Sequence, residues 1–211
     1  MTGTDLHRPL YIADVLANAL NHFPDRPLLR QLDGPTLSVR QIRDEISRFQ
    51  QALASLGVGA GSRVSLIAPN RPECLHVTHA LQMLAALYVP MHPLSALPDH
   101  LNVIRDADVE VLIFDAERFE ARAADIAKAQ PGMKLLAIGP SDLAPDIHEL
   151  AATFAAQKLV PPRVDGHDIT RLGYSGGTTG KPKGIPSVQR IGALTGLYMQ
   201  AEWEWPSPPH I

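Results

Sequence analysis

Apolar residues recur along the chain with two different spacings, and each spacing predicts one kind of element. Where they stand three or four positions apart, the pattern predicts an amphipathic helix. Such helices are expected at residues 11–23, 39–56, 73–87, 97–106, 116–129 and 147–154. Short apolar runs between glycine, proline and polar residues predict buried strands at 63–68, 88–91, 109–114, 134–138 and 169–174. Strands that alternate with helices indicate the α/β class, with a mostly parallel sheet covered by helices on both faces.

Local signals sharpen this pattern at the N-terminal end. Residues 28–37 are typical of a β-hairpin that turns at Asp33-Gly34. Ser38 follows as the predicted N-cap of the helix over 39–56, and Gln41 completes a capping box. Pro72 suits the first turn of the next helix, because proline lacks only a donor that this turn leaves unpaired anyway.

Length and composition predict a globular chain with one clear subdivision. The 211 residues are 45% hydrophobic and 19% charged, as in soluble globular proteins. Val160-Pro161-Pro162 is a candidate linker. We therefore expect an N-terminal α/β subdomain over 1–160. A second segment over 161–211 would hold a glycine-rich loop and a following helix, as the start of the next subdomain.

Several classes of function are disfavoured by the same numbers. A net charge of −3 and an aromatic share of 5% argue against nucleic-acid binding. Cys74 is the only cysteine, which excludes an internal disulfide and a thiolate metal cluster and fits a reducing, cytoplasmic compartment. Residues 1–8 show no signal-peptide pattern. The longest apolar stretch, 80–91, is too short to span a bilayer.

The most informative stretch is residues 173–184, which holds five of the 15 glycines. Glycine adopts positive φ without steric cost, so such a loop can point several backbone N–H groups at one place and hold an anion. Hydroxyls and lysines would add donors and positive charge, and hydrogen bonds to a charged partner are the stronger kind. The candidate ligand of this loop is a polyphosphate.

Two common phosphate loops do not fit this stretch. A Walker loop and a G-x-G-x-x-G turn ending at Gly180 both require glycine at position 175, which is Ser175. Pro182 follows the first lysine and prevents a helix from continuing through it. The phosphates are therefore expected to be held by a flexible, hairpin-like loop and not by the N-terminus of a helix.

Residues 174–184 read YSGGTTGKPKG and resemble the phosphate loop of the adenylate-forming enzymes, whose usual form is Tyr/Phe-Thr-Ser-Gly-Thr-Thr-Gly-x-Pro-Lys-Gly. This superfamily includes acyl-CoA synthetases, peptide-synthetase adenylation domains and luciferases. Ser175 stands for the usual threonine and Gly176 for the serine, while Lys183 matches the fixed lysine. The segments 36–42, 57–70 and 87–93 resemble further family motifs, with Ser62 for an aspartate and Ala85 for a glycine.

The resemblance is greatest to bacterial acyl-CoA synthetases and implies a two-step reaction. A carboxylic acid, most simply a fatty acid, attacks ATP to give an acyl-adenylate and pyrophosphate, and coenzyme A then takes the acyl group. The loop would bind the ATP phosphates with Mg²⁺. No catalytic residue is assigned, and no metal ligand. The implied phosphate-binding residues are Ser175, Gly176, Gly177, Thr178, Thr179, Gly180, Lys181 and Lys183.

Family members are much longer, so the chain is expected to be a truncated N-terminal piece that is inactive alone and self-associates through exposed apolar surface. Two other readings stay open: a non-catalytic nucleotide-binding or regulatory module of the same fold, and a peptide-synthetase adenylation domain. Gln189 stands where members often have histidine, beside the acyl site, and leaves the choice of acyl substrate open.

Other polar residues carry weaker signals. His76 and His79 lie three apart on a predicted helix without a third ligand nearby, and are expected to be a half-exposed pair. A packing role is expected for His92. A solvated turn is expected at Asp106, Asp108 and Glu110.

Overall fold

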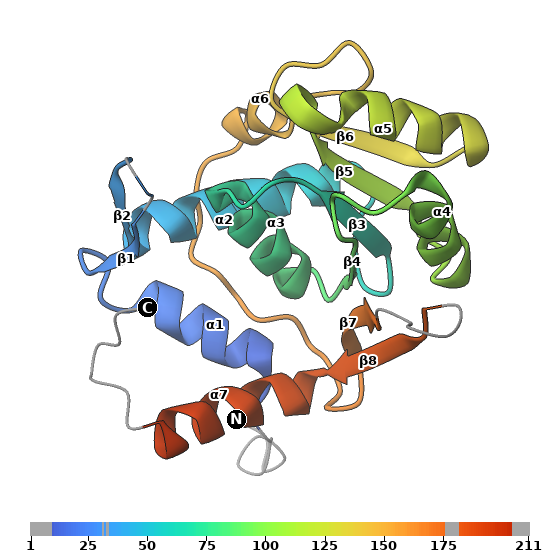
Figure 1. Cartoon of the computed structure of the whole chain (residues 1–211). Helices are drawn as coiled ribbons and strands as arrows, with labels where there is room; N and C mark the ends of the chain where they lie inside the picture. Colours follow the sequence, from blue (N-terminus) through green and yellow to red (C-terminus); the bar gives the residue numbers. More distant parts are fainter. Residues whose placement is uncertain (1–9, 31, 33, 176–181, 204–211) are drawn as a thin grey trace.

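The computed structural model describes residues 10–30, 32, 34–175 and 182–203, and Figure 1 shows the arrangement of their elements. The helices are α1 (Ile12–Asn21), α2 (Val39–Ser55), α3 (Pro72–Met83), α4 (Leu97–Asp106), α5 (Ala116–Ala129), α6 (Ile147–Ala152) and α7 (Gln189–Glu202). The strands are β1 (Pro27–Arg30), β2 (Thr36–Ser38), β3 (Arg63–Ile67), β4 (Leu87–Pro90), β5 (Val111–Asp115), β6 (Lys134–Ile138), β7 (Ile169–Tyr174) and β8 (Gly184–Val188).

The main sheet has six strands in the order β6-β5-β3-β4-β7-β8. Its first five strands pair in parallel, and β8 pairs antiparallel with β7 at the edge. The predicted α/β class with a mostly parallel sheet is confirmed. The sheet takes strands from both sides of the candidate linker 160–162, and the proposed division at residue 160 stays a prediction.

Alternate residues of the central strands face two separate cores, which is why these strands are apolar on both sides. In β5, Val111 and Ile113 lie in the core under α1, α2, α3 and α6. Leu112 and Phe114 lie in the core under α4 and α5. The successive side chains of a strand point to opposite faces, so this alternation places helices on both faces, as Figure 1 shows.

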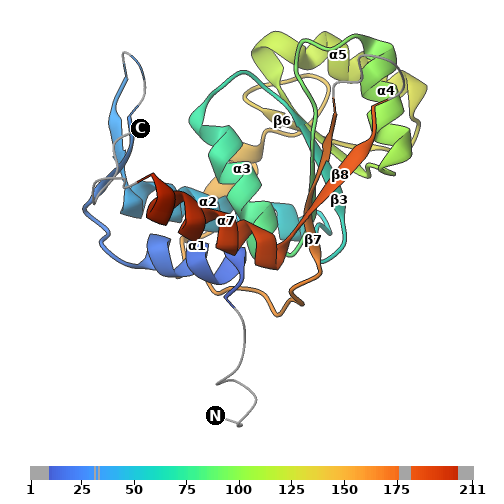
Figure 2. The same ribbon diagram turned by 60° about the horizontal axis from the view of Figure 1, so that its bottom comes forward.

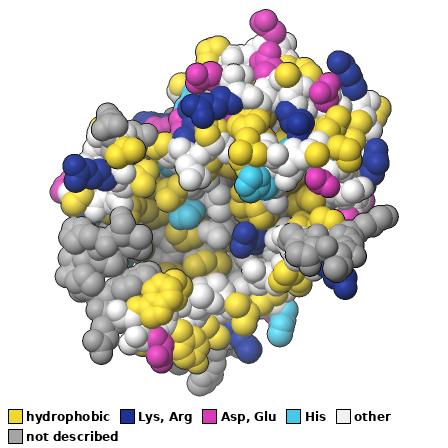
Figure 3. All heavy atoms as spheres, in the orientation of Figure 1, with side chains coloured by type: hydrophobic (Ala, Val, Ile, Leu, Met, Phe, Trp, Pro, Cys, Tyr) yellow, Lys and Arg dark blue, Asp and Glu magenta, His cyan; other side chains and the backbone are white. Residues whose placement is uncertain are grey.

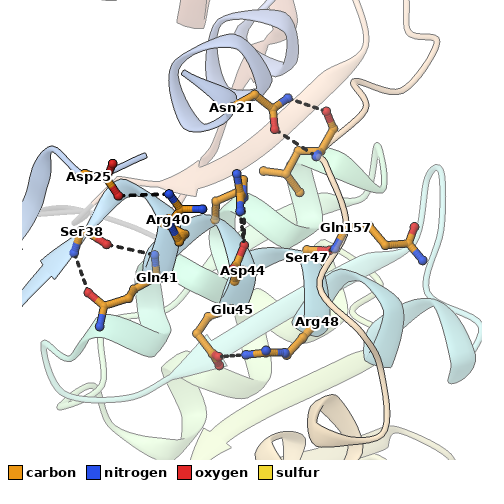
Figure 4. A network of polar contacts seen from close by, with 12 residues as sticks. Asn21, Asp25, Ser38, Arg40, Gln41, Asp44, Glu45, Ser47, Arg48 and Gln157 are labelled. Carbon is orange, nitrogen blue, oxygen red and sulfur yellow. Dashed lines mark hydrogen bonds and ion pairs between the residues drawn. The ribbon is translucent and has the colours of Figure 1, made fainter. Parts of the chain in front are cut away.

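The capping box predicted at the start of α2 is present. The Ser38 Oγ accepts from the Gln41 amide at 3.3 Å, and the Gln41 Oε1 accepts from the Ser38 amide at 2.8 Å. Figure 4 shows this reciprocal pair. The preceding hairpin, β1 with β2, is also present. These two local signals fix where the chain turns from the small hairpin into the helix that covers the sheet.

The segment between α6 and β7 is tied to the helices that it passes. The Asn21 side chain brackets Leu159, donating to its carbonyl at 2.8 Å and accepting from its amide at 3.2 Å. The Gln157 amide donates to Ser47 Oγ at 2.8 Å, beside α2 (Figure 4). These bonds hold the chain on α1 and α2 before it enters β7.

Helix α7 packs alongside α1, and Figures 1 and 2 show the two helices side by side. A Cβ added at Gly192 would lie 3.1 Å from the Cβ of Ile12, so glycine permits this approach. Gln189 is buried at the start of α7, and its Oε1 accepts from the Ala13 amide at 3.4 Å. Gln189, which stands where family members often have histidine, therefore ties α7 to α1 in this chain.

Candidate phosphate-binding hairpin

The glycine-rich stretch connects β7 to β8 at the carboxyl edge of the parallel sheet. Because β7 runs parallel to β4, its end at Tyr174 lies at the same edge as the ends of β3, β4, β5 and β6. In open parallel sheets, ligands bind outside the carboxyl ends of the strands. In the view of Figure 3 the face of the molecule is hollowed between the part that carries α1 and α7 and the part above it.

The neck of this hairpin is closed by two hydrogen bonds between Ser175 and Lys183. Tyr174 pairs with Gly184 in the strand register. One position further, the Ser175 amide donates to the Lys183 carbonyl at 3.1 Å, and the Lys183 amide donates to Ser175 Oγ at 3.3 Å. Ser175 and Lys183 thus face each other at the base of the loop, and the Lys183 side chain is exposed. The six other predicted phosphate-binding residues, Gly176, Gly177, Thr178, Thr179, Gly180 and Lys181, lie outside the described residues.

Gly184 lies in a closely packed place at this neck. A Cβ at this position would lie 3.1 Å from Leu172 Cδ1 and 3.6 Å from Tyr174 Cζ. Leu172 and Tyr174 both pack against the core under α4 and α5. The last glycine of the motif therefore leaves room for the side chains that seat the hairpin on the body.

Tyr174 makes a polar contact that the sequence did not indicate. Its hydroxyl donates to Asp106 Oδ2 at 2.6 Å, which joins the end of β7 to the end of α4. Burial, and then the hydrogen bond to Asp106, raises the pKa of Tyr174. Beside this contact is a hollow of about 440 Å³, lined by Asn102, Val103, Arg105, Asp106, Tyr174 and Pro182. The predicted solvated turn is correct in that Asp106, Asp108 and Glu110 are all exposed.

A second polar cluster lies at the same edge of the sheet, and sequence reasoning missed it. Arg71 follows β3 and forms two 2.8 Å bonds to Glu73, together with a short ion pair to the buried Asp115 at the end of β5. His148 Nε2 lies 3.4 Å from Glu73 Oε1. Burial opposes the ionisation of Glu73, but the hydrogen bonds from His148 and Arg71 prevail and hold its pKa well below the usual range. These charges compensate one another and join β3, β5, α3 and α6.

The expectation of a half-exposed histidine pair is wrong for His76. His76 is 5% exposed, and its ring meets Phe49 edge to face at 5.6 Å. Burial lowers the pKa of His76, and it lowers the pKa of the partly buried His79 to about 4. The reason is that α3 packs closely on α2, so the side of α3 that carries His76 is covered.

No metal site is formed by the part of the chain that the structure describes, because no three histidine, cysteine or acidic side chains gather there. The packing role expected for His92 is wrong, because this residue is exposed in the turn after β4. Its carbonyl lies 2.8 Å from His100 Nε2. None of the described helices is long and apolar enough to cross a membrane.

The mostly parallel six-stranded sheet with helices on both faces defines an α/β protein. The sequence model of the family described as AMP-binding enzyme matches residues 16–204. The chain belongs to this family of AMP-binding enzymes, which the sequence resemblance had indicated.

Curated relatives of the chain include fatty-acid–CoA ligases. The medium/long-chain-fatty-acid–CoA ligase FadD8 of Mycobacterium tuberculosis is 36% identical over 218 residues, an alignment that covers 100% of this chain and 38% of that protein. The long-chain-fatty-acid–CoA ligase FadD13 of the same species is 30% identical over 166 residues, which cover 75% of this chain and 32% of that protein. The chain therefore spans well under half the length of these relatives.

Solved structures share the fold over nearly the whole chain. The anthranilate CoA ligase AuaEII, in complex with anthranoyl-AMP, is 27% identical with a TM-score of 0.81, covering 93% of this chain and 38% of that one. ATP-bound MatB from Rhodopseudomonas palustris is 21% identical with a TM-score of 0.78, covering 92% and 38%. The latter likeness concerns the fold alone.

Proposed function

We propose that this chain supplies the ATP phosphate-binding loop of an ATP-dependent acyl-CoA ligase. One observation carries the proposal. The family motif forms the tip of an edge hairpin at the carboxyl side of the parallel sheet, and Ser175 and Lys183 close its neck. The closed neck brings the two ends of the loop, Ser175 and Lys183, together.

The proposed work of the loop is positioning and charge neutralisation, with no covalent step. A carboxylate attacks the α-phosphate of ATP and expels pyrophosphate, and preorganised donors stabilise the charge that develops on the leaving group. Lys183, with Lys181, would offset the phosphate charge. The Ser175 oxygen accepts from the Lys183 amide, which leaves its hydroxyl hydrogen free to donate. Further donors would come from Gly176, Gly177, Thr178, Thr179 and Gly180.

Mg²⁺ and coenzyme A belong to the proposed reaction, but the described residues do not form a site for the metal. We therefore assign no step to Mg²⁺ from this chain. A fatty acid is the proposed acyl substrate, because FadD8 and FadD13 are fatty-acid–CoA ligases by name. A cytoplasmic location is proposed on the single, reduced cysteine.

The activity is proposed for a longer protein, because the chain covers 38% of its FadD8 relative. The 211 residues alone are expected to bind ATP weakly and to give no carboxylate-dependent exchange of pyrophosphate into ATP. Robust exchange by this chain would refute the proposed inactivity.

Lys183→Ala tests the proposed loop directly. The substitution should weaken ATP binding at least about tenfold, because a charge-assisted contact contributes roughly 1.5–3 kcal/mol. Titration calorimetry with ATP measures this effect. Lys158→Ala is the matched control, since Lys158 is also exposed and lies in the segment before β7. Equal affinities for the wild type and both variants would show that Lys183 and its loop do not bind ATP.

A further inference from the structure

The contact between Tyr174 and Asp106 joins two parts of the chain that are 68 residues apart in sequence. Tyr174 is the last residue of β7 and directly precedes Ser175 at the neck of the hairpin. Asp106 is the last residue of α4. The contact therefore stands where the glycine-rich loop leaves the sheet.

The neck has limited support from the sheet itself. β4 pairs with β7 at Tyr88 and Arg171, three positions before Tyr174. On its other side β7 pairs with β8, which is the edge strand and carries Pro186. The end of the hairpin thus extends past its pairing with β4, and Leu172 and Tyr174 seat it on the neighbouring core.

The chemistry of the contact suits an anchor. Asp106 is exposed, and a carboxylate accepts a stronger hydrogen bond than a neutral oxygen. Tyr174 keeps its proton as a donor, since burial and the hydrogen bond raise its pKa. Pro182, from the other end of the loop, lines the same hollow as Asp106 and Tyr174. The last turn of α4 therefore faces both ends of the loop.

We propose that Asp106 is a positioning residue, which holds the Tyr174 hydroxyl and thereby fixes the neck from which the phosphate loop starts. That the loop binds phosphate rests on the proposed function, whereas the anchoring of the neck does not. The family motif has tyrosine or phenylalanine at this position, and phenylalanine could not form this hydrogen bond.

Hydrogen exchange of the amides in residues 174–184 tests the anchor without any ligand. Tyr174→Phe removes only the hydroxyl, and Asp106→Ala removes the acceptor. Each should accelerate exchange at Ser175, whose amide bonds across the neck, by about fivefold or more. The double variant should be no faster than either single variant, because both remove the same bond.

Two variants control for the chemical change itself. Tyr198→Phe removes a hydroxyl from the exposed face of α7, and Asp142→Ala removes a charge from an exposed loop. Both should leave exchange at the neck as in the wild type. Exchange in the β5 amides should be unchanged in all four variants, which separates a local effect from global destabilisation.

ATP titration of the same proteins links the anchor to function. Tyr174→Phe and Asp106→Ala should weaken ATP binding about fivefold, with no further loss in the double variant. If neck exchange is the same in the wild type and both variants, the inference is wrong. If exchange accelerates but the wild type binds no ATP, the anchor stands and the proposed function of the loop fails.

Discussion

At the scale of single residues, the hairpin neck contains one residue that matters for packing, Gly184, and one that matters for hydrogen bonding, Ser175. Gly184 has no side chain because Leu172 and Tyr174 occupy the space beside it. Ser175 uses its amide and its oxygen to close the neck while keeping a hydroxyl hydrogen available. Substitutions here should therefore separate effects on stability from effects on ligand binding.

Gly184→Ala should lower the free energy of unfolding by about 1 kcal/mol. Replacing glycine usually gains about 0.4–1 kcal/mol by restricting the unfolded chain. A Cβ at 3.1 Å from Leu172 adds an overpacking cost of roughly 1–3 kcal/mol, which is larger. Denaturant unfolding measures the net effect. Gly59→Ala is the control, since no atom lies within 4 Å of its added Cβ, and it should be neutral or stabilising.

Two histidines should give pH dependences of opposite sign. The pKa of His79 falls from 6.5 to about 4 on burial, so the unfolded chain binds more protons. The free energy of unfolding therefore falls as the pH drops from 6.5 toward 4, by up to about 3 kcal/mol. The hydrogen bond to Glu73 raises the pKa of His148, so His148 stabilises the fold below pH 6.5 and loses this effect as pH rises through its raised pKa.

Unfolding free energies between pH 5 and 8 check this pair. His79→Leu should flatten the loss of stability on the acid side, where the buried His76 adds a loss of the same sign. His148→Gln should leave the loss of stability on the acid side in place. It should remove the loss of stability that the wild type shows as pH rises through the raised pKa of His148. Equal pH profiles for the wild type and His79→Leu would contradict the assignment.

At the scale of elements, the end of α3 shows why the chain departs from its sequence pattern. The apolar spacing predicts a helix to residue 87, but α3 ends at Met83. Ala85 has φ +53°, and the Ala86 amide donates to Leu81 O at 2.9 Å, as in a Schellman motif. This position is usually glycine, and the family pattern also has glycine there.

Ala85→Gly should raise the free energy of unfolding by about 1 kcal/mol, because it relieves the left-handed strain of an alanine. Thermal and denaturant unfolding both report this change. Ala121→Gly, in the exposed middle of α5, is the matched control and should cost about 1 kcal/mol. A loss of stability in both variants would contradict the interpretation that Ala85 is strained at the C-terminal end of α3.

Elements with strong local signals could be predicted closely from the sequence. The bounds of α4, α5, β6 and β7 agree with their predicted ranges, and the capping box of α2 was foreseen. β8 was missed because it is mostly exposed, contains Pro186 and has no alternating pattern. Its existence depends on pairing with β7.

The candidate site was only partly predictable for a similar reason. The glycine spacing and the hydroxyls indicate the loop, because these residue types serve a local purpose. The contact of Tyr174 with Asp106, and that of Arg71 with Asp115, join residues 68 and 44 positions apart. Such pairs follow from the order of strands in the sheet, which no local spacing encodes.

At the scale of the whole molecule, apolar surface gathers on α7. Exposed apolar residues on or next to this helix are Ile191, Leu194, Leu197, Tyr198 and Trp203. Figure 3 shows hydrophobic side chains in this lower part of the molecule. Contiguous apolar surface tends to be covered by association.

Light scattering should therefore find the 211 residues as a dimer or a larger species. Leu197→Glu combined with Tyr198→Glu should shift the protein toward monomer, because the charges would oppose burial of this face. Glu substitution at Leu94, which is exposed and lies between β4 and α4, is the control. A monodisperse monomer of the wild type would contradict the expectation.

The position of β7 also bears on how the protein is made. β3, β4, β5 and β6 pair with one another and draw only on residues before 139. β7 joins them at β4, about 80 residues after that strand in sequence. Because chains fold from the N-terminal end during synthesis, the four-stranded body can form while the later residues are still in the ribosome. The β7–β8 hairpin then pairs with the edge of β4, which has already formed.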